Sequence, residues 1–185
     1  MKIKLLLITL LIPLFIVNCK PDTDEVQSSD TIMKQAQRQA FWQGKKVFVI
    51  WHASWCGWCH RMDSLMVKPE VKDFFDDNYV IVHMVVKEAK KLKHLENPGA
   101  EEFLASFNGD KSGIPFWVIL DRKGRLLADS YMRDEGVGMD EPGKNVGSPA
   151  NPDEVDHFIK VLKETSKMTD DELKLIAELF LIKKS

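Results

Sequence analysis

The sequence predicts an α/β sandwich, with a central mixed sheet of about four strands flanked by helices and an extra helix at the C-terminus. Three short runs, at 46–52, 79–86 and 116–120, are almost continuously apolar and rich in β-branched and aromatic residues. Such runs are typical of strands that are covered on both faces. Segments with apolar residues at helical spacing separate them, and this alternation favours a sheet between helical layers.

The composition fits one globular domain with short additional segments. The chain has 185 residues, of which 44% are hydrophobic and 29% charged, and this balance argues against disorder. Its 26 basic and 28 acidic residues leave no excess of positive charge to hold nucleic acid, which is therefore not an expected partner. The chain has 3 cysteines, too few for a disulfide scaffold, and an odd number cannot pair completely within one chain.

Residues 1–18 are expected to form a signal peptide. Lys2 and Lys4 precede an apolar run at 5–17, which is too short to span a bilayer core of about 30 Å as a permanent helix. The run ends in the tetrapeptide Ile-Val-Asn-Cys at 16–19, which resembles the lipobox of bacterial lipoproteins although its first and third residues depart from the usual ones.

The lipobox resemblance implies that Cys19 is lipidated and becomes the first residue of the mature protein. The alternative is that Cys19 is incidental and that an ordinary signal peptidase cleaves nearby. Residues 19–30 contain almost no apolar side chain and are expected to form a flexible tether to the membrane. The folded domain is then expected over 31–185, in the bacterial cell envelope and facing the periplasm.

Boundary signals mark the first helix and the first strand. Ser29 or Asp30 can cap a helix over 31–43, and Gly44 can end it. The strand at 46–52 follows directly.

The middle of the chain continues the alternation of helix and strand. After a turn at 53–55, residues 56–66 have helical spacing. Pro69 can begin a further helix that leads to the strand at 79–86. A helix at 98–107 then precedes the third apolar run.

The last third of the chain contains a hairpin, a long loop and two helices. Residues 121–124 form a turn into a strand at 125–130, and residues 131–150 have no periodicity, so that we expect a long loop there. Long ordered loops in compact domains are often functional. Asn151 caps a helix that begins at Pro152, and a capping box begins the last helix, at 169–183.

Cys56 and Cys59 are the candidate redox pair. They lie at the expected start of a helix, where two cysteines three residues apart can close a small disulfide. The unpaired N–H groups of the first helical turn and the helix dipole favour thiolate at Cys56 and lower its pKa. Cys56 is therefore the expected attacking group, and the more buried Cys59 is expected to resolve the mixed disulfide.

Zinc binding and covalent haem attachment are two other uses of such a pair. A zinc site would need a second pair of ligands, which the sequence does not supply, so no metal is expected. Covalent c-type haem is the stronger alternative, because Cys56 to His60 matches C-x-x-C-H. The strand before the motif and the strand-forming half after it argue against haem, and we expect no cofactor besides the Cys56–Cys59 disulfide.

The strand, the W-C-x-x-C motif, the helix and the later Gly113-Ile114-Pro115 before a strand are together similar to the thioredoxin superfamily. The resemblance covers about 31–164, and W-C-x-W-C-H-x-M at 55–62 resembles exported, lipid-anchored bacterial thioredoxin-like thiol-disulfide oxidoreductases. It implies a thioredoxin-like sandwich in which Pro115 is cis and lies against the disulfide. Pro115 and the backbone of Ile114 would bind an extended substrate chain.

Four tryptophans lie near the motif and could form an apolar rim for substrate. We expect Trp55 and Trp58, together with Gly57 between the cysteines, to face the substrate. Core packing is the favoured interpretation for Trp51, whereas Trp117 follows Pro115 closely and is a further candidate for the rim.

One departure from the family concerns proton transfer. Thioredoxins carry a buried Asp six residues before the first cysteine, and this chain has Ile50 there. His83, at the position of a buried family Lys, and His52, on the strand leading into the site, are the candidate replacements, because their ordinary pKa values suit proton transfer. The competing interpretation is a packed or surface histidine.

These features predict a protein-disulfide reductase or isomerase that acts on disulfide-containing or unfolded envelope proteins. We expect a monomer that reaches the membrane through its lipid anchor and a membrane redox partner that restores the dithiol. The alternative from another class is a non-catalytic thioredoxin-fold binding or chaperone module that grips a partner with the loop at 131–150.

Overall fold

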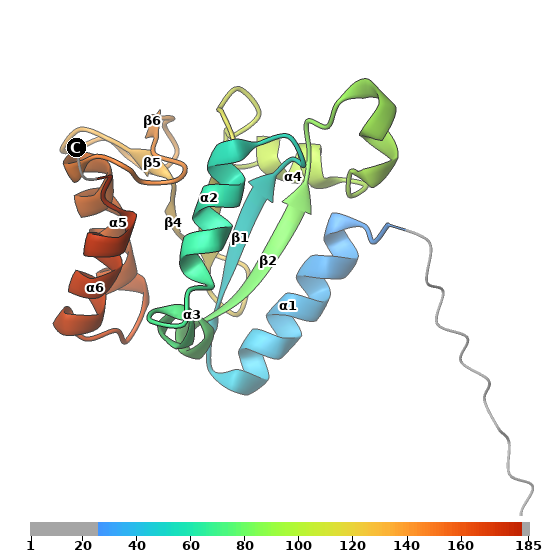
Figure 1. Cartoon of the computed structure of the whole chain (residues 1–185). Helices are drawn as coiled ribbons and strands as arrows, with labels where there is room; N and C mark the ends of the chain where they lie inside the picture. The colour runs from blue at the N-terminus through green and yellow to red at the C-terminus, as the bar shows by residue number, and fades with distance from the viewer. Residues whose placement is uncertain (1–25, 183–185) are drawn as a thin grey trace, which may run out of the picture.

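The computed structural model describes residues 26–182. Its centre is a four-stranded sheet in the order β2-β1-β3-β4 (Figure 1). Strands β1 and β2 are parallel, whereas β3 runs antiparallel to β1 and β4 antiparallel to β3. The strands are β1 Lys46–His52, β2 Tyr79–Val85, β3 Phe116–Leu120 and β4 Leu126–Asp129. The expected mixed sheet between helices is therefore confirmed.

Helices cover both faces of this sheet. Because side chains alternate along a strand, Phe48 and Ile50 pack on one face with α2, α3, α5 and α6, whereas Val47 and Val49 pack on the other with α1 and α4. Figure 1 shows α5 and α6 on the opposite side of α2 from α1. The helices are α1 Ser29–Gln43, α2 Gly57–Met66, α3 Lys72–Asn78, α4 Ala100–Ala105, α5 Pro152–Thr165 and α6 Asp170–Phe180, with a 3-10 helix η1 at Lys90–Leu95.

Several expected boundaries are corrected by the structure. Helix α1 begins at Ser29 and its cap is Ser28, because Ser28 has extended backbone and its side chain accepts from the N–H of Thr31. The last part of the expected tether, at 29–30, is thus helical. Residues 67–71 form turns rather than helix after Pro69, and α3 begins only at Lys72.

The later helices also differ from expectation at their ends. Helix α4 occupies only 100–105 of the expected 98–107, since Gly99 precedes it with a left-handed φ of 79°. Asn151 caps α5 and the capping box at Thr169 begins α6, both as predicted, although α6 ends at Phe180 rather than near residue 183.

Residues 131–150, called the late loop below, contain more structure than expected. Two short strands, β5 Tyr131–Met132 and β6 Lys144–Asn145, pair in antiparallel fashion. The chain after β6 is buried from Val146 to Pro149. The late loop is therefore a small ribbon whose second half packs into the domain.

The predictions for residues 1–18 and for lipidation of Cys19 lie outside the described residues. Within 26–182, no helix is long and apolar enough to cross a bilayer.

Candidate redox site

The two cysteines are joined in a disulfide at the start of α2. Strand β1 ends at His52, a short turn follows, and Cys56 is the N-cap of α2 with extended backbone. The first helical turn brings Cys59 back to it, with a Cα–Cα distance of 5.3 Å. Cys56 is 4% exposed and Cys59 fully buried, so the sulfur of Cys56 is the one nearer to solvent.

The backbone at the helix start faces the Cys56 sulfur. The N–H of Cys59 lies 3.2 Å from Cys56 Sγ and points at it. The first turn of α2 carries no acidic side chain. A negative charge on Cys56 Sγ, once the disulfide is reduced, would therefore meet an N–H donor and the positive end of the helix dipole.

The segment before β3 lies against the disulfide. The Ile114–Pro115 peptide bond is cis, as the resemblance implies. The carbonyl oxygen of Ile114 is 3.4 Å from Cys56 Sγ, and its side chain packs on the cluster of Ala53, Cys56 and Cys59. Among residues 26–182 the N–H of Ile114 has no hydrogen-bond partner.

The tryptophans divide between surface and core. Trp55 and Trp58 are 59% and 52% exposed, and Gly57 between the cysteines is exposed as well. Trp51 and Trp117 are fully buried on opposite faces of the sheet. The apolar surface beside the disulfide thus contains Trp55 and Trp58, whereas Trp117 is a core residue and not part of a rim.

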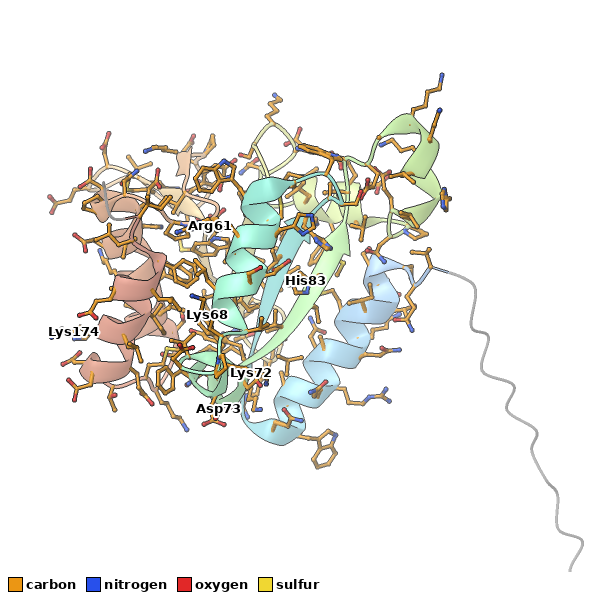
Figure 2. The ribbon with its side chains drawn as sticks, viewed as in Figure 1. Arg61, Lys68, Lys72, Asp73, His83 and Lys174 are labelled. Carbon is orange, nitrogen blue, oxygen red and sulfur yellow. A yellow bond between two sulfur atoms is a disulfide. The ribbon has the colours of Figure 1, made fainter. Side chains whose placement is uncertain are left out.

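The two candidate histidines lie together beside α2. Ile50 is fully buried and is the register partner of His83 on β2. The ring centroids of His52 and His83 are 5.0 Å apart, and His83 Nε2 is 2.9 Å from Asp63 Oδ1 on α2. Figure 2 shows His83 on β2 beside α2.

The surroundings of the two imidazoles differ. Burial lowers the pKa of His52, and the neighbouring His83 lowers it further. The side chain of His83 is 39% exposed, so it is not buried as the family Lys is. Within the described chain, no hydrogen bond joins either imidazole to a cysteine sulfur.

Glu88 is a site residue that the sequence analysis missed. It is 4% exposed and accepts from the N–H of Ser54 at 2.5 Å and from its hydroxyl at 2.8 Å. These hydrogen bonds lower the pKa of Glu88. His60 Nε2 is 2.8 Å from the carbonyl oxygen of Ser54, so both side chains fix the turn before Cys56. The sequence signal for Glu88 was its position just after β2, a strand parallel to β1, because parallel strands end at the same edge of a sheet.

Arg61 connects α2 with the C-terminal part of the chain. Its guanidinium donates to Ser148 Oγ at 2.9 Å, to the carbonyl oxygen of Pro149 at 2.7 Å and to that of Phe180. It also lies 5.7 Å from the ring centroid of Trp58. Figure 2 shows Arg61 on the side of α2 that faces α5 and α6.

The second half of the late loop lies beside the cis-proline segment. A depression of about 280 Å³ opens there. It is lined by Trp58, Gly113, Ile114, Pro115, Asn145, Val146, Gly147, Ser148 and Glu154. The predicted substrate-contacting residues Trp58, Ile114 and Pro115 are thus brought together, with a wall that the sequence did not predict.

The alternatives for the cysteine pair can be compared with this geometry. Covalent haem would need both sulfurs in thioether bonds, whereas here they are bonded to each other and His60 pairs with Ser54. Among the described residues, no group of three or more His, Cys, Asp or Glu side chains is arranged to hold a metal ion. The arrangement favours thiol-disulfide exchange.

Comparison with models of protein families gives a match over half of the chain. A family model described as thioredoxin-like matches residues 30–122. No curated protein matches the chain significantly.

Solved structures resemble the fold at low sequence identity. The disulphide isomerase from Xylella fastidiosa Temecula1 is 18% identical with a TM-score of 0.47, over 60% of this chain and 79% of that chain. The C-terminal domain of Neisseria meningitidis DsbD in its oxidised form is 16% identical with a TM-score of 0.43, over 76% of this chain and 98% of that chain. The exposed lipoprotein thioredoxin Etrx1 of Streptococcus pneumoniae strain TIGR4 is 20% identical with a TM-score of 0.34, over 55% and 82%. Their TM-scores all lie below 0.5, so the assignment of the family rests on the family model.

Proposed function

The chain belongs to the thioredoxin-like family, and from this premise we propose that it is a thiol-disulfide oxidoreductase whose redox couple is Cys56 and Cys59. The observation that carries the proposal is the disulfide itself. It joins a cysteine at a helix N-terminus near solvent to a buried one, and it lies against the Ile114–Pro115 segment.

Each cysteine has a separate task in the exchange. The Cys56 thiolate attacks one sulfur of a target disulfide, the target S–S bond breaks, and the released target thiolate takes up a proton. Cys59, deprotonated, then attacks Cys56 Sγ and releases the second target sulfur. Two electrons pass to the target, which becomes a dithiol, and Cys56 and Cys59 become a disulfide. A dithiol donor must return two electrons before the next cycle.

The backbone of Ile114 is the proposed docking point for the target. Its N–H is without a partner among the described residues and its carbonyl oxygen lies 3.4 Å from Cys56 Sγ. An extended chain that pairs with this backbone would hold its own sulfur near Cys56. The exposed rings of Trp55 and Trp58 offer apolar surface beside Cys56.

Proton transfer for Cys59 is assigned to the pair of His52 and His83. Ile50 occupies the position of the family's buried carboxyl group, and its register partner on β2 is His83. His83 lies beside His52 and is hydrogen-bonded to Asp63. Asp63 lies on the same helix as Cys59, which supports the assignment. A His83→Ala protein in which attack by Cys59 keeps its rate and pH profile would remove His83 from the mechanism.

The proposal also includes the direction of electron flow, the targets and the location of the protein in the cell. We propose the reductive or isomerising direction, with disulfide-containing or unfolded envelope proteins as targets. Of the two directions we prefer the reductive one, because one domain suits simple electron transfer better than isomerisation. The support for an envelope location and a lipid anchor at Cys19 is the sequence of residues 1–19. Measuring the reduction potential of the Cys56–Cys59 couple tests the direction, since reductants and oxidants of this kind differ in potential.

Insulin reduction by dithiothreitol tests the activity. The protein should accelerate it, and Cys56→Ser should return the rate to that of dithiothreitol alone. Cys19→Ser is the matched control, because it also replaces one cysteine by serine but lies outside residues 30–122, which match the family model, and its rate should equal that of the unchanged protein. Equal rates for Cys56→Ser and the unchanged protein would instead support a non-catalytic binding or chaperone module.

A further inference from the structure

The side chain of Asn145 uses its whole hydrogen-bonding capacity around the cis-proline segment. Its Nδ2 donates to the carbonyl oxygens of Gly113 at 2.8 Å and of Pro115 at 3.2 Å. Its Oδ1 accepts from the hydroxyl of Ser130 at 2.7 Å and from the N–H of Gly147 at 3.1 Å. A carboxamide has two donor hydrogens and two acceptor sites, so all four are occupied.

This pattern determines which backbone groups remain for a ligand. The carbonyls on both sides of Ile114 are held by Asn145, whereas the N–H of Ile114 has no partner among residues 26–182. The carbonyl oxygen of Ile114 faces Cys56 Sγ. A polypeptide beside Cys56 therefore finds both a free donor and a free acceptor on Ile114.

Asn145 also forms part of the wall of the adjoining depression. That depression, of about 280 Å³, runs from Trp58 along the cis-proline segment to Val146. It has room for the residues next to the cysteine of an extended chain. A small disulfide has no backbone to pair with Ile114 and does not need this depression.

Resting on the oxidoreductase function proposed above, we propose that Asn145 is a positioning residue for polypeptide substrates. Its amide group fixes the carbonyls of Gly113 and Pro115, so that the N–H and carbonyl oxygen of Ile114 stay aligned for an extended chain. The substrate class that depends on Asn145 is then a disulfide within a polypeptide, and reaction with small disulfides is independent of it.

The test compares two disulfides that release the same group. In the full chain carrying Cys19→Ser and Cys59→Ser, Cys56 is the only cysteine left. Its thiolate attacks the cysteine sulfur of an extended peptide whose cysteine carries thionitrobenzoate. A disulfide forms between Cys56 and the peptide, and coloured thionitrobenzoate leaves with the electron pair of the broken bond. The small probe is dithiobis(nitrobenzoate), which releases the same anion.

Two variants of Asn145 separate its donor from its acceptor. Asn145→Ala should lower the rate with the peptide about tenfold relative to the rate with the small probe, which corresponds to about 1.4 kcal/mol. Asn145→Asp keeps an acceptor for Ser130 and Gly147 but places carboxylate oxygens against the two carbonyls. It should therefore lower the ratio at least as much as Asn145→Ala.

Asn78→Ala is the matched control. The carboxamide of Asn78 also bridges two backbone segments, donating to the carbonyl oxygen of Phe74 and accepting from the N–H of Lys167, both at 2.8 Å. It is the last residue of α3, directly before β2, at the opposite end of the sheet from Cys56. Its loss should lower stability without changing the ratio of the two rates.

The outcomes separate this inference from the proposed function. A ratio unchanged in both Asn145 variants, or lowered equally by Asn78→Ala, would overturn the positioning role. Failure of the unchanged protein to accelerate insulin reduction would overturn the oxidoreductase function. If the ratio still fell in the Asn145 variants, the role of Asn145 in docking a polypeptide at Cys56 would stand even though the oxidoreductase function had been overturned.

Discussion

Replacing Gly147 by alanine tests how closely the late loop is packed against the cis-proline segment. Gly147 has a φ of +57°, and a Cβ placed on it would lie 2.9 Å from the backbone oxygen of Pro115. Gly136 is the matched control, because its φ is +87° and a Cβ there would meet nothing within 4 Å. Both substitutions put a side chain on left-handed backbone, but only Gly147→Ala also creates a close contact.

The expected loss of stability follows from these two terms. Left-handed backbone costs alanine about 1–2 kcal/mol, and reduced freedom of the unfolded chain offsets about 0.4–1 kcal/mol of that. Gly136→Ala should therefore lower the free energy of unfolding by about 1 kcal/mol. For Gly147→Ala the contact is with backbone and must be relieved by movement, which adds about 1–3 kcal/mol, for a total of about 2–4 kcal/mol.

Urea unfolding of the oxidised proteins, followed by tryptophan fluorescence, measures both losses. Because the carbonyl oxygen of Pro115 is held by Asn145, Gly147→Ala should also slow the reaction of Cys56 with the peptide probe. If the two alanine variants lost the same free energy within about 0.5 kcal/mol, Gly147 would not be in tight contact with Pro115 and the reasoning would fail.

Three further predictions concern the rest of the domain. Arg61→Met should lower the free energy of unfolding by about 2 kcal/mol, because its hydrogen bonds to the late loop and α6 are lost, whereas Arg38→Met on exposed α1 surface should change it little. Burial lowers the pKa of His52 and of His157, so the unfolded chain binds more protons near their ordinary pKa of 6.5. The free energy of unfolding should therefore keep its full value above pH 6.5 and decline as the pH falls below it. His52→Gln should make this decline shallower, as measured by urea unfolding at a series of pH values. Thr169→Ala removes the capping box of α6 and should cost about 1 kcal/mol in the same assay, with Tm lowered in parallel.

Local sequence chemistry predicted the elements whose determinants are local. Strand β1 and strand β3 have the predicted bounds because their apolar runs end sharply at polar or turn residues. The caps at Asn151 and Thr169 were predictable because the capping side chain and the N–H that it accepts from lie three residues apart. The start of α3 was wrong because Pro69 permits a helix without requiring one.

Features that depend on distant parts of the chain were not predictable in this way. The strands β5 and β6 have only two residues each, so no alternation of side chains could indicate them. Cys56 and Cys59 could be identified as site residues from one motif, and Pro115 from a second motif that resembles the thioredoxin superfamily. Glu88 and Asn145, in contrast, reach the site only through the arrangement of strands, and neither lies in a motif.

The family match ends at residue 122, and this boundary divides the site into two parts. The disulfide, the cis-proline segment and the two candidate histidines all precede it. Asn145 and the groups that hold Arg61, on Ser148, Pro149 and Phe180, all follow it. In the proposed function, the matched part supplies the sulfur chemistry. The role proposed for Asn145 places the control of the backbone geometry that a polypeptide substrate meets in the part beyond residue 122. Changes after residue 122 should then alter the choice among polypeptide disulfides before they alter the reactivity of Cys56 toward small ones.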